Sequence, residues 1–171
     1  MMRSGPVGMI AAVLLAAPTV AADYVADLGP MPLDDETKAV IAGRGEAHAT
    51  VRQGRVDVRG SFKGLPSPAT AVHILLSPAI GVPGTRILSL DLSGQTEGTF
   101  SGNIRLNGRQ AAALRTGRLY VQVDSEKAPP GYSWGSKGTL WGWLLPAHST
   151  AGQGVPQQGH WFLPQLDTPA R

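Results

Sequence analysis

Apolar and polar residues alternate with a period of two along most of the chain from residue 44 onward. Ala47, Ala49 and Val51 alternate with polar residues, and the alternation resumes after a tight turn at Gln53-Gly54. Successive side chains of a strand point to opposite faces of a sheet, so this stretch predicts a β-hairpin with one apolar face. Further short strands are predicted at residues 70–76, 86–92, 98–106, 118–124 and 139–145.

One helix is predicted between the strands at 98–106 and 118–124. Asn107 can cap its first turn, Gln110 follows at the spacing of a capping box, and Gly117 is suited to end it. Acidic residues at 34–36 also predict one or two helical turns near the N-terminus, since negative charge favours the start of a helix.

This series of about seven short strands, separated by turns that contain Gly and Pro, indicates an all-β domain. We expect an Ig-like or Greek-key antiparallel β-sandwich with one short helix. Composition supports a fold with many turns, since the 171 residues include 22 Gly and 14 Pro. The sequence has no cysteine, which excludes disulfides, thiolate metal sites and a cysteine nucleophile.

Residues 1–22 are expected to be a Sec signal peptide. Arg3 supplies the positive charge, and an apolar run follows at 7–17. This run of about 11 residues is short of the roughly 20 that a membrane-spanning helix needs. Small residues precede Asp23, so we expect cleavage after Ala22 and a periplasmic or secreted product without a membrane span. A retained membrane anchor is the alternative.

The rest of the chain divides into three parts by composition. They are a leader at 23–43, the β domain at 44–146 and a flexible Gly/Pro/Gln-rich tail at 147–171. Trp161-Phe162 in the tail could dock on the domain or on a partner.

Positive charge is scattered along the chain, which has a formal charge of +3 and no basic run. The densest group is Arg52, Arg55 and Arg59, with Asp57 among them. This mixture predicts a solvated strand face and no nucleic-acid partner.

A nucleophile motif of the G-x-S-x-G type occurs at 131–135. The motif requires a strand before the serine and a helix after it. Pro129-Pro130 and a Gly-rich stretch flank it here, so we expect a loop, no catalytic residues and no enzyme activity.

The four histidines lack the spacing that would place two imidazoles on one strand or helix face. His73 lies within an apolar run, where its ring nitrogens need partners, and we expect a core or interface residue. Trp141 and Trp143 share one side of a strand and are expected to fill a core. If exposed, they and Trp134 would instead form a platform for a sugar or a protein partner.

The pattern from residue 43 to 146 resembles the CHRD domain, the β module of chordin and of many exported bacterial proteins. The stretch Gly117–Val123 is similar to the family's G-x-x-Y-V-x-V-H-T, and Leu140–Leu144 occupies the place of its I-R-G-Q-L. Other matching segments are Gly45–Ala47, Gly60–Leu65, Ala69–Ile74 and Gly84–Leu88.

The chain departs from the family at its histidines. The family commonly has a His-x-His pair on the third strand, but this chain has His73 followed by Ile74 and Leu75, and a later family histidine aligns with Asp124. The resemblance therefore implies no metal site and no cofactor here. Asp124 could pair with His73 if their strands are adjacent.

The resemblance implies a non-catalytic exported module that acts by protein–protein contacts, for example as an accessory subunit of a periplasmic complex. The partner would be an envelope protein that the sequence does not identify. A carbohydrate or envelope-polymer binder is the first alternative, and a Cu/Zn superoxide dismutase-like metalloprotein is a less favoured one. The candidate interaction or family-motif positions are His73, Tyr120, Asp124, Trp141 and Trp143.

Overall fold

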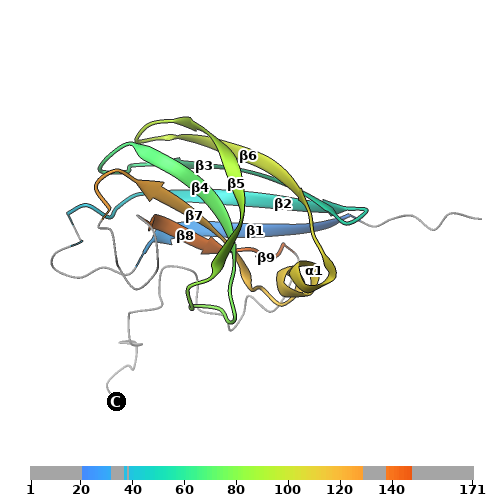
Figure 1. The fold of residues 1–171 in the computed structure, drawn as a ribbon. Helices are drawn as coiled ribbons and strands as arrows, with labels where there is room; N and C mark the ends of the chain where they lie inside the picture. The colour runs from blue at the N-terminus through green and yellow to red at the C-terminus, as the bar shows by residue number, and fades with distance from the viewer. Residues whose placement is uncertain (1–20, 32–36, 38, 129–137, 148–171) are drawn as a thin grey trace, which may run out of the picture.

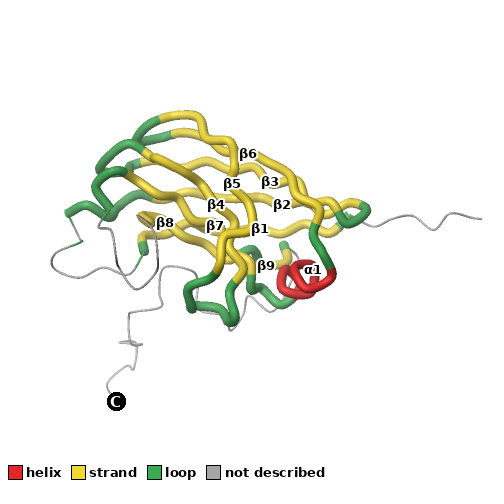
Figure 2. Tube along the Cα trace, in the orientation of Figure 1, coloured by secondary structure: helices red, strands yellow, loops and turns green. Residues whose placement is uncertain are grey.

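Nine antiparallel strands and one helix make up the computed structural model, which describes residues 21–31, 37, 39–128 and 138–147 (Figures 1 and 2). The elements are β1 (Ala22–Pro30), β2 (Arg44–Arg52), β3 (Arg55–Lys63), β4 (Ala69–Leu76), β5 (Thr85–Gly94), β6 (Gly98–Arg105), α1 (Gly108–Arg115), β7 (Leu119–Ser125), β8 (Gly138–Trp143) and β9 (Leu145–Pro146).

The sheet closes on itself, so the predicted open sandwich is wrong. Its strand order is β2-β3-β6-β5-β4-β7-β8-β1, and β1 pairs again with β2. The short strand β9 adds to β1 outside this ring. Alternation with a period of two is the same in a sandwich and a barrel, because it reports the two faces of a strand and not its neighbours. The all-β class and the single short helix were predicted correctly.

Strand β1 closes the barrel. Its first part pairs with β2 from Ala22 opposite Val51 to Leu28 opposite Gly45, and its last two residues pair with β8. Most of this stretch was predicted to be a leader, but the strands of the barrel extend from Ala22 in β1 to Trp143 in β8. Residues 1–20, which the predicted signal peptide occupies, lie outside the described residues.

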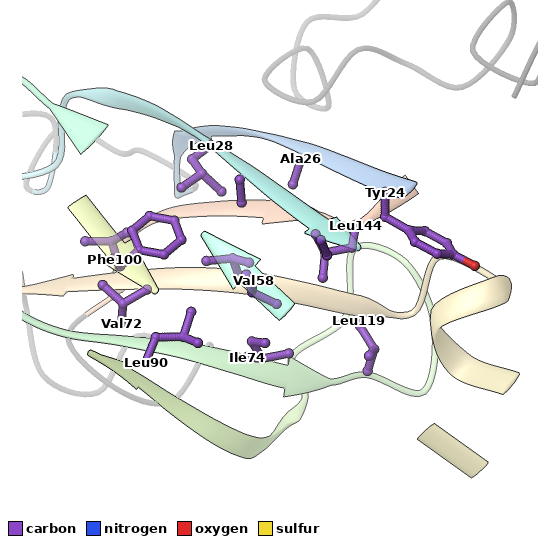
Figure 3. Packing of buried hydrophobic residues seen from close by; sticks show 14 of the residues in the cluster. Tyr24, Ala26, Leu28, Val58, Val72, Ile74, Leu90, Phe100, Leu119 and Leu144 are labelled. Carbon is purple, nitrogen blue, oxygen red and sulfur yellow. The ribbon is translucent and has the colours of Figure 1, made fainter. Parts of the chain in front are cut away.

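The barrel interior is filled by side chains of unequal size. Figure 3 shows Leu28, Phe100 and the other labelled apolar residues converging on the space between the strands. Leu28 lies against Gly142, where an added Cβ would come within 2.6 Å of the leucine Cδ2 atom. A Cβ on Gly60 would lie 2.3 Å from the ring of Phe100. Large residues thus occupy the space that facing glycines leave, as in other small barrels.

Helix α1 covers one end of the barrel beside Tyr24 and Leu119 (Figures 1 and 3). Its buried residues Ala113 and Leu114 belong to the interior core. The predicted capping box is confirmed, since the Asn107 side chain accepts from the Gln110 backbone N–H and the Gln110 side chain accepts from the Asn107 N–H. No helix in the part of the chain that the structure describes is long and apolar enough to cross a membrane.

Two further expectations fall largely on undescribed residues. The first is the helical turns predicted at 34–40, of which residues 34–36 and 38 are not described. Among the described residues there, the Thr37 carbonyl accepts from the N–H groups of Val40 and Ile41. The second is the tail predicted at 147–171, of which residue 147 alone is described.

Candidate functional site

The five candidate residues from the sequence lie together on the outer side of three neighbouring strands. Val72 and Ile74 of β4 point into the barrel, so His73 between them points outward. The same alternation places Tyr120 and Asp124 of β7, and Trp141 and Trp143 of β8, on this side. We call the outer side of β4, β7 and β8 the aromatic face.

The aromatic face is buried. Trp141 is 6% exposed and Trp143 is 1% exposed. Met31, Leu75 and the partly buried Ile80 and Leu145 pack against the aromatic rings. This burial agrees with the prediction that the two tryptophans fill a core, and they are not available to stack on a sugar. Trp134 and the G-x-S-x-G motif lie outside the described residues.

Tyr120 is the centre of the aromatic cluster. Its ring centroid lies 4.6 Å from that of Trp143 and 6.2 Å from that of Trp141, the second contact being edge to face. Its hydroxyl oxygen accepts from the Gly84 N–H at 3.1 Å. Burial raises the pKa of Tyr120, the hydrogen bond from Gly84 partly opposes this rise, and the negative charge of Asp124 adds to it. The hydrogen bond from Gly84 to the Tyr120 hydroxyl connects the β4–β5 loop to strand β7 of the barrel.

A buried polar group lies beside the aromatic rings. His73 is opposite Gln122 in the β4–β7 pairing, and Asp124 follows two residues later on the same side of β7. The Gln122 Nε2 atom donates to Asp124 Oδ1 at 2.7 Å. The His73 Nε2 atom is 3.7 Å from Asp124 Oδ2, which is an ion-pair distance longer than a hydrogen bond. The structure thus brings His73 and Asp124 together, as their proposed pairing requires.

Burial also controls the protonation of the histidine. The loss of water around His73 lowers its pKa, the charge of Asp124 raises it in part, and the charge of Arg86 on β5 lowers it further. The His73 Nδ1 atom has no hydrogen-bond partner among the described residues. The folded protein therefore resists protonation of His73 more than the unfolded chain does.

The described residues contain no group of three or more His, Cys, Asp or Glu side chains that could hold a metal ion. His73 and Asp124 together supply only two side chains that could act as metal ligands. His48 lies on the outer side of β2 near Glu46, with 4.0 Å between the Nε2 and Oε2 atoms. His148 and His160 lie outside the described residues.

A second feature, which could not be predicted from the sequence, is a hollow lined mostly by polar residues on the opposite outer side of the barrel. It has a volume of about 520 Å³ and lies over β2, β3, β6 and β5. The residues that define this outer hollow are Glu46, His48, Arg59, Gly60, Ser61, Asp91, Leu92, Ser93, Thr99, Phe100 and Ser101. The sequence shows the polar positions of each alternating strand, from which these residues could have been chosen. It does not show the strand order that brings them together.

Comparison with known proteins identifies the family but no individual relative. The model of the CHRD domain matches residues 28–132, which is more than half of the chain. The matched stretch begins within β1 and includes His73, Tyr120 and Asp124. No curated protein and no solved structure matches the chain. This match identifies the chain as a member of the CHRD domain family.

Proposed function

We propose that this protein is an exported, non-catalytic β-barrel module that binds another protein of the cell envelope through the outer hollow. One observation carries the proposal: the barrel interior is occupied by its own side chains, while the outer side of β2, β3, β6 and β5 has a hollow lined mostly by polar residues. A ligand of such a barrel has to be bound on its outer surface, because the interior leaves it no room.

The chemistry of the outer hollow suits a protein surface. Strand pairing places His48, Arg59, Ser101 and Asp91 in one row across the four strands. The row combines both signs of charge with a hydroxyl side chain, so it offers both hydrogen-bond donors and hydrogen-bond acceptors to a partner. Polar groups arranged in this way provide specificity for a complementary protein surface.

The same observations favour a protein over a glycan. Sugar binding by stacking needs exposed aromatic rings, and Trp141 and Trp143 are buried on the aromatic face. Phe100 is the one aromatic residue among those that line the outer hollow, and its ring is buried in the barrel interior. A role as an accessory subunit of a periplasmic complex, with residues 1–22 as the export signal, is the form of this function that we propose.

Site-specific photo-crosslinking tests the proposal. A photoreactive amino acid is placed at Thr99 or Ser101, both exposed on the outer side of β6, and the protein is expressed in its own host. The matched control position is Val82, which is 40% exposed in the β4–β5 loop. We expect the same envelope protein to be joined from both β6 positions and not from Val82. No adduct, or the same adduct from all three positions, would contradict the function.

A further inference from the structure

Strands β5 and β6 pair over only part of their length. Their pairing runs from Gly94 opposite Gly98 to Asp91 opposite Ser101, and there it ends. Beyond this point β5 pairs with β4 and leads back to the β4–β5 loop, while β6 stays paired with β3 and leads to α1 (Figure 1). The two strands therefore diverge within the wall of the barrel.

This divergence leaves two unpaired strand edges. Residues Thr85–Leu90 of β5 have a strand partner on the β4 side alone, and residues Gly102–Arg105 of β6 have one on the β3 side alone. Every second residue of an antiparallel strand turns its N–H and C=O toward a given neighbour. In the described part of the chain, no backbone hydrogen bond joins these two stretches to each other or to another segment on their open sides. We call the two stretches the β5–β6 seam.

A β-bulge in β5 accounts for the divergence. Ile74 lies opposite Leu88 and the next residue, Leu75, lies opposite Arg86, so Ile87 is an extra residue in β5. A bulge bends the strand that carries it and is a common device for ending strand pairing. The seam is therefore a consequence of how β5 pairs with β4.

The inner side of the seam is apolar and only partly covered. Leu88 of β5 and Ile104 of β6 pack against the interior core but are partly buried. Leu90 and Phe100, which lie where β5 and β6 still meet, are buried. An added strand with apolar side chains on its inner face would remove further apolar surface of Leu88 and Ile104 from water, which favours binding.

The outer side of the seam is positively charged. Arg86 and Arg105 are the two charged residues of the seam, and both are exposed. Neither guanidinium group forms an ion pair within 4.0 Å with a carboxylate of the described residues. The charged residues that face outward from the adjoining parts of β3 and β5 are Arg55, Asp57, Arg59 and Asp91. Because Asp91 lies at the closed end of the seam, an acidic ligand would place its charges toward the open end.

These features specify the side chains of a strand that would fit the seam. Successive side chains of a strand point to opposite faces, so apolar residues would turn inward to Leu88 and Ile104 and acidic residues outward to Arg86 and Arg105. A second copy of this chain is a poor occupant, since pairing seam to seam would bring the same arginines together and like charges repel.

We propose that the β5–β6 seam binds an extended segment of the partner protein as an added β-strand, and that apolar and acidic residues alternate in this segment. The inference rests on the proposed function and specifies the chemistry of the partner. The seam adjoins the outer hollow, because Asp91 and Ser101 form the last pair before the strands diverge and also line the hollow. One partner can therefore contact both.

The first test is the binding of synthetic peptides to the purified exported protein, measured by fluorescence anisotropy. The probe is a peptide of about six residues, the usual length of a strand, in which valine and glutamate alternate. A control peptide of the same composition has all its valines before all its glutamates. Two further peptides carry N-methyl groups on the backbone nitrogens of either the valines or the glutamates, which removes the donors that face one neighbouring strand.

We expect the alternating peptide to bind more tightly than the control of the same composition. At least one of the two N-methylated peptides should bind about 25-fold more weakly, since each backbone hydrogen bond strengthens binding roughly fivefold and at least two are lost. Amide hydrogen exchange should become slower within Thr85–Leu90 or Gly102–Arg105 when the peptide binds. Unchanged affinity of both N-methylated peptides would overturn the inference, because side chains alone would then hold the peptide.

The role of the arginines is tested by charge reversal. The variant R86E/R105E is compared with R44E/R52E, which makes the same change in net charge on β2. Circular dichroism and thermal unfolding establish that both variants are folded. R86E/R105E should bind the alternating peptide roughly tenfold more weakly, and it should prefer a peptide with lysine in place of glutamate. Equal weakening in R44E/R52E would overturn the inference, because net charge would then explain the binding.

Photo-crosslinking from Ser89, an exposed residue of β5, relates the seam to the partner in the host. We expect Ser89 to be joined to the same envelope protein as Thr99 and Ser101, through a segment in which apolar and acidic residues alternate. An adduct with residues 148–171 of this chain, or with a second copy, would overturn the inference. Adducts from Thr99 and Ser101 without any peptide binding would overturn it as well and leave the proposed function standing. Peptide binding at the seam without an envelope adduct from any of the three positions would contradict the proposed function instead.

Discussion

The Nε2 atom of His73 on β4 lies 3.7 Å from the Oδ2 atom of Asp124 on β7, and both side chains are buried on the aromatic face. The carboxylate also accepts from Gln122. The pair thus connects two neighbouring strands through groups that can both ionise. Because burial outweighs the attraction of Asp124 and lowers the pKa of His73, this pair makes the stability of the barrel dependent on pH.

The folded protein is expected to lose stability as the pH falls below the ordinary histidine pKa of 6.5. Below this pH the unfolded chain takes up a proton that the folded state resists. The contribution of His73 to the free energy of unfolding is therefore complete above the ordinary pKa and declines below it. The measurement is the free energy of unfolding in urea between about pH 7 and pH 5, the range in which histidine titrates. The substitution His73→Gln should make the decline shallower.

His48→Gln is the matched control for this change, since His48 is exposed on β2. Its pH profile should follow that of the unmodified protein. If His73→Gln and His48→Gln have the same profile, His73 is not the group responsible.

Closure of the barrel is expected to depend on Gly142. An added Cβ would lie 2.3 Å from the carbonyl oxygen of Asp27 and 2.6 Å from Leu28 Cδ2, where β8 meets β1. Gly142→Ala should therefore destabilise the protein by about 1–3 kcal/mol, as overpacking does. Gly108→Ala in the first turn of α1 is the control, because its Cβ would meet no atom within 4 Å. Equal midpoints of urea unfolding for the two variants would contradict the tight approach at Gly142.

The hydroxyl of Tyr120 is expected to stabilise the β4–β5 loop. Tyr120→Phe removes the acceptor of the Gly84 N–H and should cost about 1 kcal/mol. Exchange of the Gly84 amide hydrogen should become faster. Tyr24→Phe is the control, since the Tyr24 hydroxyl makes no hydrogen bond with the described residues and points away from the core (Figure 3). Unchanged exchange at Gly84 in Tyr120→Phe would show that this hydrogen bond does not hold the loop.

Export should leave a mature protein that begins at Asp23. Ala22 is paired with Val51 in the closed barrel, so the peptidase should reach the cleavage site before β1 joins the sheet. The intact mass of the protein recovered from the envelope tests this expectation. Replacement of the small Ala22 by Trp should block processing, because the cleavage site requires small residues. Recovery of the unprocessed chain from the cytoplasm would contradict the export signal.

Local features of the fold were predictable because they depend on neighbouring residues. The strands follow from alternation, and α1 follows from Asn107, Gln110 and Gly117, whose side chains and backbone act within one or two turns. The resemblance to the CHRD family and the choice of His73, Tyr120 and Asp124 also came from order and spacing along the chain. All three residues lie on one face in the structure, although a functional role for them stays a prediction.

The amino-acid sequence alone determined the all-β class, the position of the helix and which residues face inward in the alternating strands from β2 onward. Only the tertiary structure decided that the sheet closes, because closure depends on hydrogen bonds from β1 to both β2 and β8. It also decided which charges meet: Arg52 and Arg105 are far apart in the sequence, and the β2–β3–β6 pairing places them on either side of Arg55. The physical reason is that alternation sets the face of a side chain, whereas its neighbours are set by strand pairing between distant segments.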